Sequence, residues 1–174
     1  MQISKLIKAN IHSLEVAEKI LLKITDAQYQ VVIEPFSASL GKHFRHITDH
    51  YRLLLAGLPQ ALVEYDERER LKAEEDERLV MIMRLRSICN QLSHMAQNCQ
   101  NDQSVLVCLA VNEDGDAPSV PSTLSRELVF LQSHNVHHYA IISAILKLQN
   151  IEVESGFGTA PSTLKYEYRQ QCAP

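Results

Sequence analysis

Six of the eight histidines in this 174-residue sequence occur in two clusters. The first cluster contains His43, His46 and His50, and the second contains His134, His137 and His138. Imidazole is the commonest side-chain ligand for transition metals, and two histidines at positions i and i+4 of a helix can share one ion. The two clusters therefore direct attention to a metal site that lies between two helices.

The second cluster carries the stronger indication. An α-helix advances about 100° per residue, which places His134 and His138 one turn apart at the centre of an apolar helix face. A single histidine on such a face is usually a hydrogen-bonded core residue, but two neutral imidazoles one turn apart do not easily satisfy each other. A buried polar group without a partner costs roughly 1–3 kcal/mol, and a divalent cation would satisfy both rings. We interpret His134 and His138 as metal ligands.

The first cluster can supply the remaining ligand. His43, His46 and His50 follow one flank of an apolar helical stripe, so they face a neighbouring helix, and their spacing leaves open which of them binds. Three imidazole ligands leave an open coordination position, as in catalytic metal sites. The sequence argues against a di-iron carboxylate centre, because no clustered histidine has a glutamate three residues before it. It also argues against a thiolate zinc site, because the cysteines are isolated.

Two carboxylates lie near the histidines in sequence. Glu127 precedes His134 by one heptad on the same helix face, and we predict a catalytic role for it as a general base or as an acceptor for a ligand imidazole. Its alternative is an ordinary acidic residue near a helix start. Asp49 either orients His46 or pairs with Arg45 at the surface, and the surface pairing is favoured.

The elements that must position these residues are long helices. Apolar periodicity predicts helices over 3–24, from a cap at Ser37 or Ser39 to Gly57, over a segment from about Leu79 to Met95, and from Pro121-Ser122 to about Gln149. The charged segment 64–78 is expected to be a solvated loop, and Asp114-Gly115 indicates a small hairpin. The predicted fold is all-α: a four-helix bundle with a small β-hairpin inserted between helices three and four.

Composition bounds the class of protein. The length suits a single domain, 1–174, whose tail from about 151 to 174 is expected to be mostly irregular. The 17 Lys and Arg against 21 Asp and Glu argue against a nucleic-acid-binding protein. The sequence contains neither a membrane-length apolar run nor a recognisable signal peptide. The four cysteines form no C-x-x-C pair, so we expect a reduced, cytoplasmic protein.

Several stretches resemble the DinB-like (DinB/YfiT) superfamily of bacterial four-helix bundles. The stretch SLGKHFRHITDHYRLLL (39–55) is similar to its second-helix motif. The stretch SHNVHHYAII (133–142) is similar to its fourth-helix His-x-x-His-His motif, whose first and last histidines bind metal. EYDERER (64–70) and GFGTAPSTL (156–164) are similar to one uncharacterised branch. The expected helix order and hairpin position also agree, so the resemblance covers nearly the whole chain.

The resemblance implies a metal site formed by His46, His134 and His138, with His43 and His50 as alternatives to His46. It implies that replacing His46 abolishes tight binding while replacing His43 leaves it largely intact. The implied metal is zinc, nickel or a similar divalent ion. The resemblance also favours a homodimer. Some members of the superfamily are transferases that use low-molecular-weight thiols, while isomerases and many proteins without known activity share the fold.

Three functional hypotheses follow. The first is a metal-dependent thiol transferase acting on small electrophilic molecules. The second is a non-catalytic metal-binding or stress-associated bundle protein. The third is an oligomerising bundle whose histidines form only a hydrogen-bonded core. Metal analysis separates the third hypothesis from the others, and a thiol-conjugation assay separates the first from the second.

Overall fold

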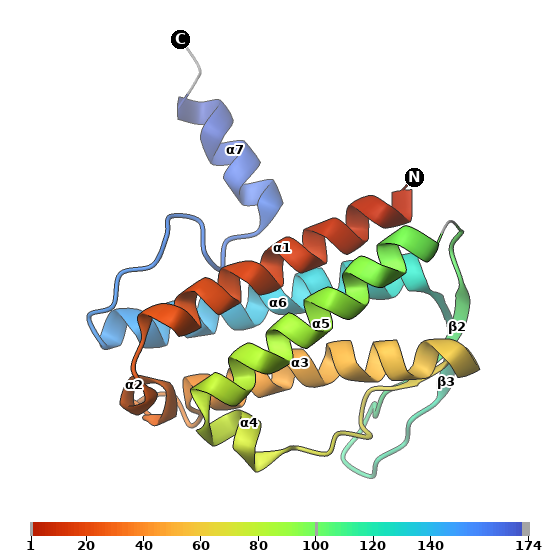
Figure 1. Ribbon diagram of the computed structural model, residues 1–174, viewed down its shortest axis with the longest axis horizontal. Helices are drawn as coiled ribbons and strands as arrows, with labels where there is room; N and C mark the ends of the chain where they lie inside the picture. Colours follow the sequence, from red (N-terminus) through yellow and green to blue (C-terminus); the bar gives the residue numbers. More distant parts are fainter. Residues whose placement is uncertain (1, 100, 172–174) are drawn as a thin grey trace.

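Four long helices form the body of the protein and contain about half of its residues (Figure 1). The computed structural model describes residues 2–99 and 101–171. The long helices are α1 (Gln2–Lys23), α3 (Leu40–Gly57), α5 (Arg78–Asn98) and α6 (Leu124–Leu148). Both α1 and α3 pack against α5 and α6, and the apolar stripes of all four helices form one buried core. The predicted predominance of helix is therefore confirmed.

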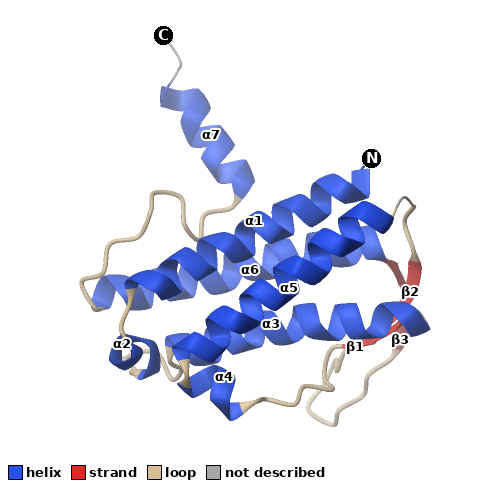
Figure 2. Cartoon of the chain, in the orientation of Figure 1, coloured by secondary structure: helices blue, strands red, loops and turns tan. Residues whose placement is uncertain are grey.

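Short elements connect the long helices (Figure 2). They are α2 (Asp26–Gln30), the 3₁₀ turn η1 (Leu58–Gln60), β1 (Leu62–Glu64), α4 (Lys72–Asp76), β2 (Ser104–Cys108) and β3 (Ser119–Thr123). A further helix, α7 (Pro161–Gln171), follows the last long helix. α4 lies within the segment 64–78, so the expectation of a solvated loop there is corrected. Thr25 forms a capping box with Gln28, which explains why the polar stretch after α1 makes a helical turn.

The expected hairpin is present, and a third strand extends it. β2 pairs antiparallel with β3, and β1 pairs in parallel with β2, giving the order β1-β2-β3. β1 ends at Glu64, which is the first residue of the segment 64–78 that was expected to be a solvated loop. Tyr65 and Glu74 are almost completely buried, so the interpretation of 64–78 as a solvated loop is wrong at these two positions. A three-residue strand is too short to show a periodicity that the sequence alone would reveal.

The helix starts follow local capping chemistry. Of the two serines considered for the second long helix, Ser39 is the cap, and its side chain accepts a hydrogen bond from the Lys42 backbone N–H. The fourth long helix begins later than expected, at Leu124, because Pro121 and Ser122 belong to β3 and Thr123 is the cap. This capping places Glu127 in the first turn of α6.

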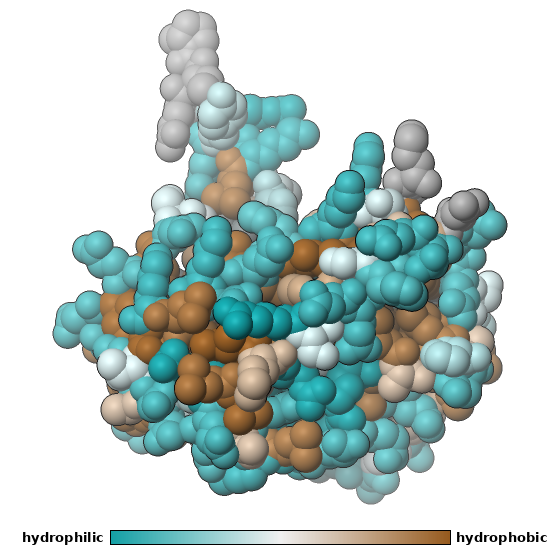
Figure 3. Space-filling view, in the orientation of Figure 1, coloured by the Kyte–Doolittle hydropathy of each residue, from teal (hydrophilic) through white to brown (hydrophobic). Residues whose placement is uncertain are grey.

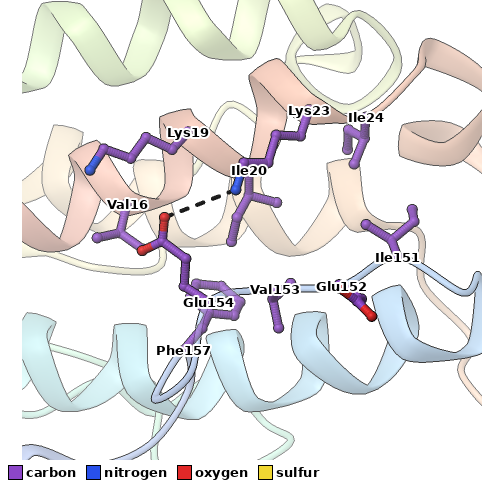
Figure 4. A pocket seen from close by; sticks show the side chains of 10 residues that line it. All are labelled: Val16, Lys19, Ile20, Lys23, Ile24, Ile151, Glu152, Val153, Glu154 and Phe157. Atoms are coloured by element: carbon purple, nitrogen blue, oxygen red, sulfur yellow. Dashed lines mark ion pairs between the residues drawn. The ribbon is translucent and has the colours of Figure 1, made fainter.

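The chain after α6 is not wholly irregular. Residues 151–157 run along α1, where Ile151, Val153 and Phe157 meet Ile20 around a small cavity (Figure 4). An ion pair of 3.9 Å between Lys23 and Glu154 closes one side of it. After this segment, α7 begins at Pro161, so the expectation of a mostly irregular tail is corrected. Proline is favoured at the first position of a helix, which explains where α7 begins. α7 projects away from the four long helices (Figure 1).

The surface is mainly hydrophilic, with hydrophobic patches between the polar side chains on the face shown in Figure 3. Leu79 and Met83 of α5 and Leu22 of α1 are among the exposed apolar residues. No helix in the described ranges is both long enough and apolar enough to cross a membrane. The three described cysteines, Cys89, Cys99 and Cys108, are free, and Cys172 lies outside the described residues.

Candidate metal centre

The packing of α3 against α6 brings the two histidine clusters together. His46 of α3 and His134 and His138 of α6 each offer one ring nitrogen, and these three nitrogens lie within 4.8 Å of one another. The ring centroids of His134 and His138 are 4.5 Å apart, and His46 lies 4.9 and 4.7 Å from them. The three residues that the resemblance implied as ligands thus form one group that could hold a metal ion.

An unpartnered buried nitrogen supports this reading. Nε2 of His134 is buried and has no hydrogen-bond partner in the described structure. A buried imidazole nitrogen without a partner is costly, and a metal ion is one way to satisfy it. The residues present therefore fit a bound divalent cation.

Burial keeps the three imidazoles neutral, the form in which histidine binds metals. Burial, together with neighbouring imidazoles, lowers the pKa of His46 to about 2, that of His134 to about 4 and that of His138 to about 3. Repulsion between like charges lowers these pKa values further, because protonated rings in contact would all be positively charged. Protons therefore compete weakly with a metal at this cluster near neutral pH.

His50 is the fourth imidazole of the cluster. Its ring centroid lies 4.3 Å from that of His134 and 4.6 Å from that of His46. Its Nδ1 donates to the backbone carbonyl of His46 at 2.8 Å, which leaves Nε2 as the lone-pair nitrogen. Ligand histidines commonly donate their other N–H to a carbonyl in this manner. His50 therefore stays open as an alternative to His46 as the ligand from α3.

His43 contacts the cluster through His138. Its Nδ1 lies 3.1 Å from Nδ1 of His138, so one of the two nitrogens donates to the other. When Nδ1 of His138 is the donor, Nε2 of that ring carries the lone pair and can bind a metal. His43 is therefore placed to orient a ligand histidine. His137, the remaining member of the second cluster, is exposed.

An arginine also reaches the cluster. Arg68 lies in the connection between β1 and α4, and its Nη1 is 2.9 Å from Nδ1 of His46. The segment around Arg68 was expected to be solvated, and no role at the site was predicted for this residue. The only signal was its place in the EYDERER stretch (64–70), whose resemblance implied no role for it.

Glu127 is completely buried at the start of α6. It accepts hydrogen bonds from the Tyr65 hydroxyl at 2.8 Å, from the Ser122 hydroxyl and from Arg126 Nη1 at 3.0 Å. Among its hydrogen bonds in the described structure, none comes from a histidine. The catalytic role of Glu127 stays a prediction, and its hydroxyl partners are ones that the sequence did not identify.

A pocket lies beside the histidine cluster. It has a volume of about 290 Å³ between the sheet and the first turns of α6. Its mainly apolar wall includes Glu127, Tyr65 and Phe130. Tyr65 stacks on His50 with a centroid distance of 5.3 Å, and Phe130 lies 5.7 Å from His134. These two aromatic rings therefore contact both the pocket and the imidazoles, whereas no histidine lines the cavity drawn in Figure 4.

Asp49 does not contact the imidazoles in the way that would orient His46. Its carboxylate pairs with Arg45 Nη1 at 3.0 Å, and Arg52 Nη2 lies 3.7 Å away. The pairing with Arg45 was expected, but its placement at the surface was wrong, because both partners are buried. Arg45 also pairs with Glu75 at 3.2 Å, so this buried network ties α3 to the α4 region.

Comparison with known proteins adds one similarity. No protein-family model matches the chain, and no solved structure matches it. The chain is 30% identical over 109 residues to FK506-binding protein 5 of Rhizopus delemar. The match covers 63% of this chain and 28% of that protein. The chain therefore spans little more than a quarter of this relative, whose name describes the binding of FK506 by the longer protein.

Proposed function

We propose that the chain is a DinB-like four-helix-bundle protein that binds a divalent metal ion, zinc or nickel, through His46, His134 and His138. The observation that carries the proposal is the convergence of these three imidazoles from α3 and α6 to within 4.8 Å. The unpartnered Nε2 of His134 supports it further. The packing of α1, α3, α5 and α6 and the hairpin before α6 agree with the bundle that the resemblance implies.

The proposed activity is that of a thiol transferase that acts on a small electrophilic molecule. A divalent metal at the three histidines would lower the pKa of a low-molecular-weight thiol and favour the nucleophilic thiolate. The apolar pocket beside Phe130 and Tyr65 would hold the electrophile. Glu127 lines that pocket and is our candidate acceptor for the thiol proton. As the sulfur–carbon bond forms, the bond to the leaving group breaks, and the leaving group takes its electron pair.

The second candidate is a non-catalytic metal-binding or stress-associated bundle protein with the same site. The burial of Glu127 favours this candidate, because its carboxylate already accepts hydrogen bonds from three donors. In either case we propose a cytoplasmic homodimer whose ligands are small molecules and that binds neither nucleic acid nor membrane. The exposed apolar side chains of α1 and α5 are consistent with a second copy packing there.

Metal analysis tests the site. We expect protein purified without a histidine tag to contain about one divalent ion per chain, and His134→Ala and His138→Ala each to remove most of it. Elemental analysis measures this, and His12→Ala is a matched control because His12 is exposed on α1. Full occupancy in either α6 variant would contradict the assignment. Loss in His50→Ala with retention in His46→Ala would move the α3 ligand to His50.

A conjugation assay then tests the activity. The metal-loaded protein is mixed with 1-chloro-2,4-dinitrobenzene and low-molecular-weight thiols, and formation of the thioether and chloride is followed. We expect turnover by the wild type and its loss in His138→Ala. A protein that binds metal but accelerates no thiol conjugation would favour the non-catalytic candidate.

A further inference from the structure

Arg68 presents an incompletely compensated charge at the histidine cluster. Within the described residues, its ion-pair partner is Asp66, with a distance of 3.7 Å between Nη2 and Oδ1. Nε of Arg68 is buried without a hydrogen-bond partner. Its remaining polar contact to a side chain is the one to His46 Nδ1 at 2.9 Å. A guanidinium with five N–H donors thus has unused donor capacity at the candidate metal site.

The contact with His46 sets up a competition. A guanidinium is always a donor, so Nδ1 of His46 must be the acceptor, and the single lone pair of the neutral ring faces Arg68. The other nitrogen, Nε2, then carries the proton and cannot bind a metal. If His46 binds a metal through Nδ1, the lone pair of Nδ1 is used by the metal. If it binds through Nε2, Nδ1 carries the proton. In both cases the hydrogen bond from Arg68 has to break. Metal binding by His46 therefore releases Arg68.

We propose that Arg68 is the anion-recognising residue of this site: it holds His46 when no metal is present and, once displaced, binds the negatively charged group of a small-molecule ligand. The inference rests on the proposed metal site and specifies the class of ligand that the site takes. A released Arg68 remains on a short connection beside the imidazoles, with its unpartnered Nε available to an acceptor.

Charge balance determines the ligand class. The imidazoles are neutral, so a divalent ion and the Arg68 guanidinium would place uncompensated positive charge in a half-buried site, where Coulomb interactions are stronger than in water. A small anion reduces that repulsion, whereas a neutral ligand leaves it in place. The planar guanidinium fork pairs bidentately with carboxylates, and the thiolate form of the proposed thiol substrate carries the same sign of charge. We therefore assign the ligand as a small carboxylate- or thiolate-bearing anion.

Two binding measurements test the proposal with Arg68→Gln. The first is zinc affinity by competition with a chromophoric chelator in a weakly coordinating buffer. The variant should bind zinc about tenfold more tightly, because one charge-assisted hydrogen bond no longer competes for His46. The second is titration of acetate, 2-mercaptoethanol or ethanol into cobalt-loaded protein, followed by the visible absorption of the cobalt. Acetate and 2-mercaptoethanol should bind the wild type and bind the variant about tenfold less tightly, and ethanol should bind neither.

Arg70→Gln is the matched control, because Arg70 is exposed on the same connection and the substitution removes the same charge. It should leave both measurements near wild type. Arg68→Lys keeps the charge and should retain part of the anion affinity, which guards against loss through misfolding. Equal zinc affinity in wild type and Arg68→Gln, or anion binding unchanged by that substitution, would overturn the inference while leaving the metal site standing. A wild type that binds neither zinc nor cobalt would overturn the proposed metal site itself.

Discussion

Hydrogen-bond roles distinguish the five imidazoles that α3 and α6 bring together. A neutral ring has one donor nitrogen and one acceptor nitrogen, so a partner at one nitrogen determines what the other can do. His50 donates to a backbone carbonyl, His46 accepts from Arg68, and the two Nδ1 atoms of His43 and His138 face each other. His134 is left with an unpartnered Nε2. Spacing along a helix does not contain this information.

The resemblance implies that replacing His43 leaves metal binding largely intact, whereas the contact of His43 with His138 leads us to expect a partial loss. Without His43, the ring of His138 loses the partner that orients it. We expect His43→Leu to lower zinc affinity by about 10–100-fold without abolishing binding, the range typical for groups that orient a ligand. His43→Gln retains an acceptor oxygen and should lose less. Competition titration with a chelator measures both, and equal affinities for His43→Leu and wild type would show that the contact has no orienting role.

At the scale of the elements, the short elements and connections packed around α3 supply site residues that do not lie on the long helices. The connection between β1 and α4 brings Tyr65 against His50 and Arg68 against His46. α4 in turn packs against the beginning of α3, where Arg45 pairs with Glu75. This close packing is possible because Gly41 has no side chain. A Cβ there would overlap the backbone carbonyl of Glu75 and approach the ring of Tyr29.

Gly41→Ala should therefore destabilise the protein, although glycine-to-alanine changes inside helices usually stabilise them. We expect a loss of about 1–3 kcal/mol in the free energy of unfolding, the usual cost of overpacking a close contact. Urea denaturation followed by circular dichroism measures it. Gly115→Ala is the comparison, because a Cβ at Gly115 meets open space and only its positive φ of 84° resists the change. A Gly41→Ala protein as stable as wild type would mean that α4 does not lie this close to α3.

At the scale of the whole molecule, the histidine cluster links folding to pH. The pKa values of His46, His134 and His138 lie at about 2, 4 and 3 in the folded protein, whereas unfolded histidine titrates near 6.5. Between those values the unfolded chain binds more protons than the folded chain. Stability therefore rises with pH in this range, and the stabilisation present above about pH 6.5 is lost as the pH falls.

We expect the melting temperature of the metal-free protein in a chelating buffer to fall between pH 7 and pH 5. The double variant His134→Gln and His138→Gln should show a shallower fall, because two of the groups with lowered pKa values are gone. Differential scanning calorimetry over this range measures both slopes. Identical slopes in the two proteins would show that the cluster does not take up protons on unfolding.

The sequence by itself determined the elements whose signals are local. Apolar residues at helical spacing located the four long helices, and Ser39 was among the two expected caps. The i and i+4 spacing of His134 and His138 placed them on one face of α6, because helical geometry depends only on neighbouring residues. His46 came from the resemblance rather than from spacing, and the structure places its ring among theirs. The family and the activity stay predictions.

Only the tertiary structure decided which side chains meet across elements. β1 pairs with a strand more than 40 residues later, and Arg68 reaches a histidine 22 residues earlier. The hydrogen bond from the Tyr65 hydroxyl to Glu127 likewise joins residues 62 positions apart. Such contacts depend on how the elements pack, and no local period encodes them, since a charged segment looks the same in sequence whether its side chains face water or an interior site. The charge of Arg68 could be read from the sequence, but its partner could be known only once α3, α6 and the connection after β1 had packed together.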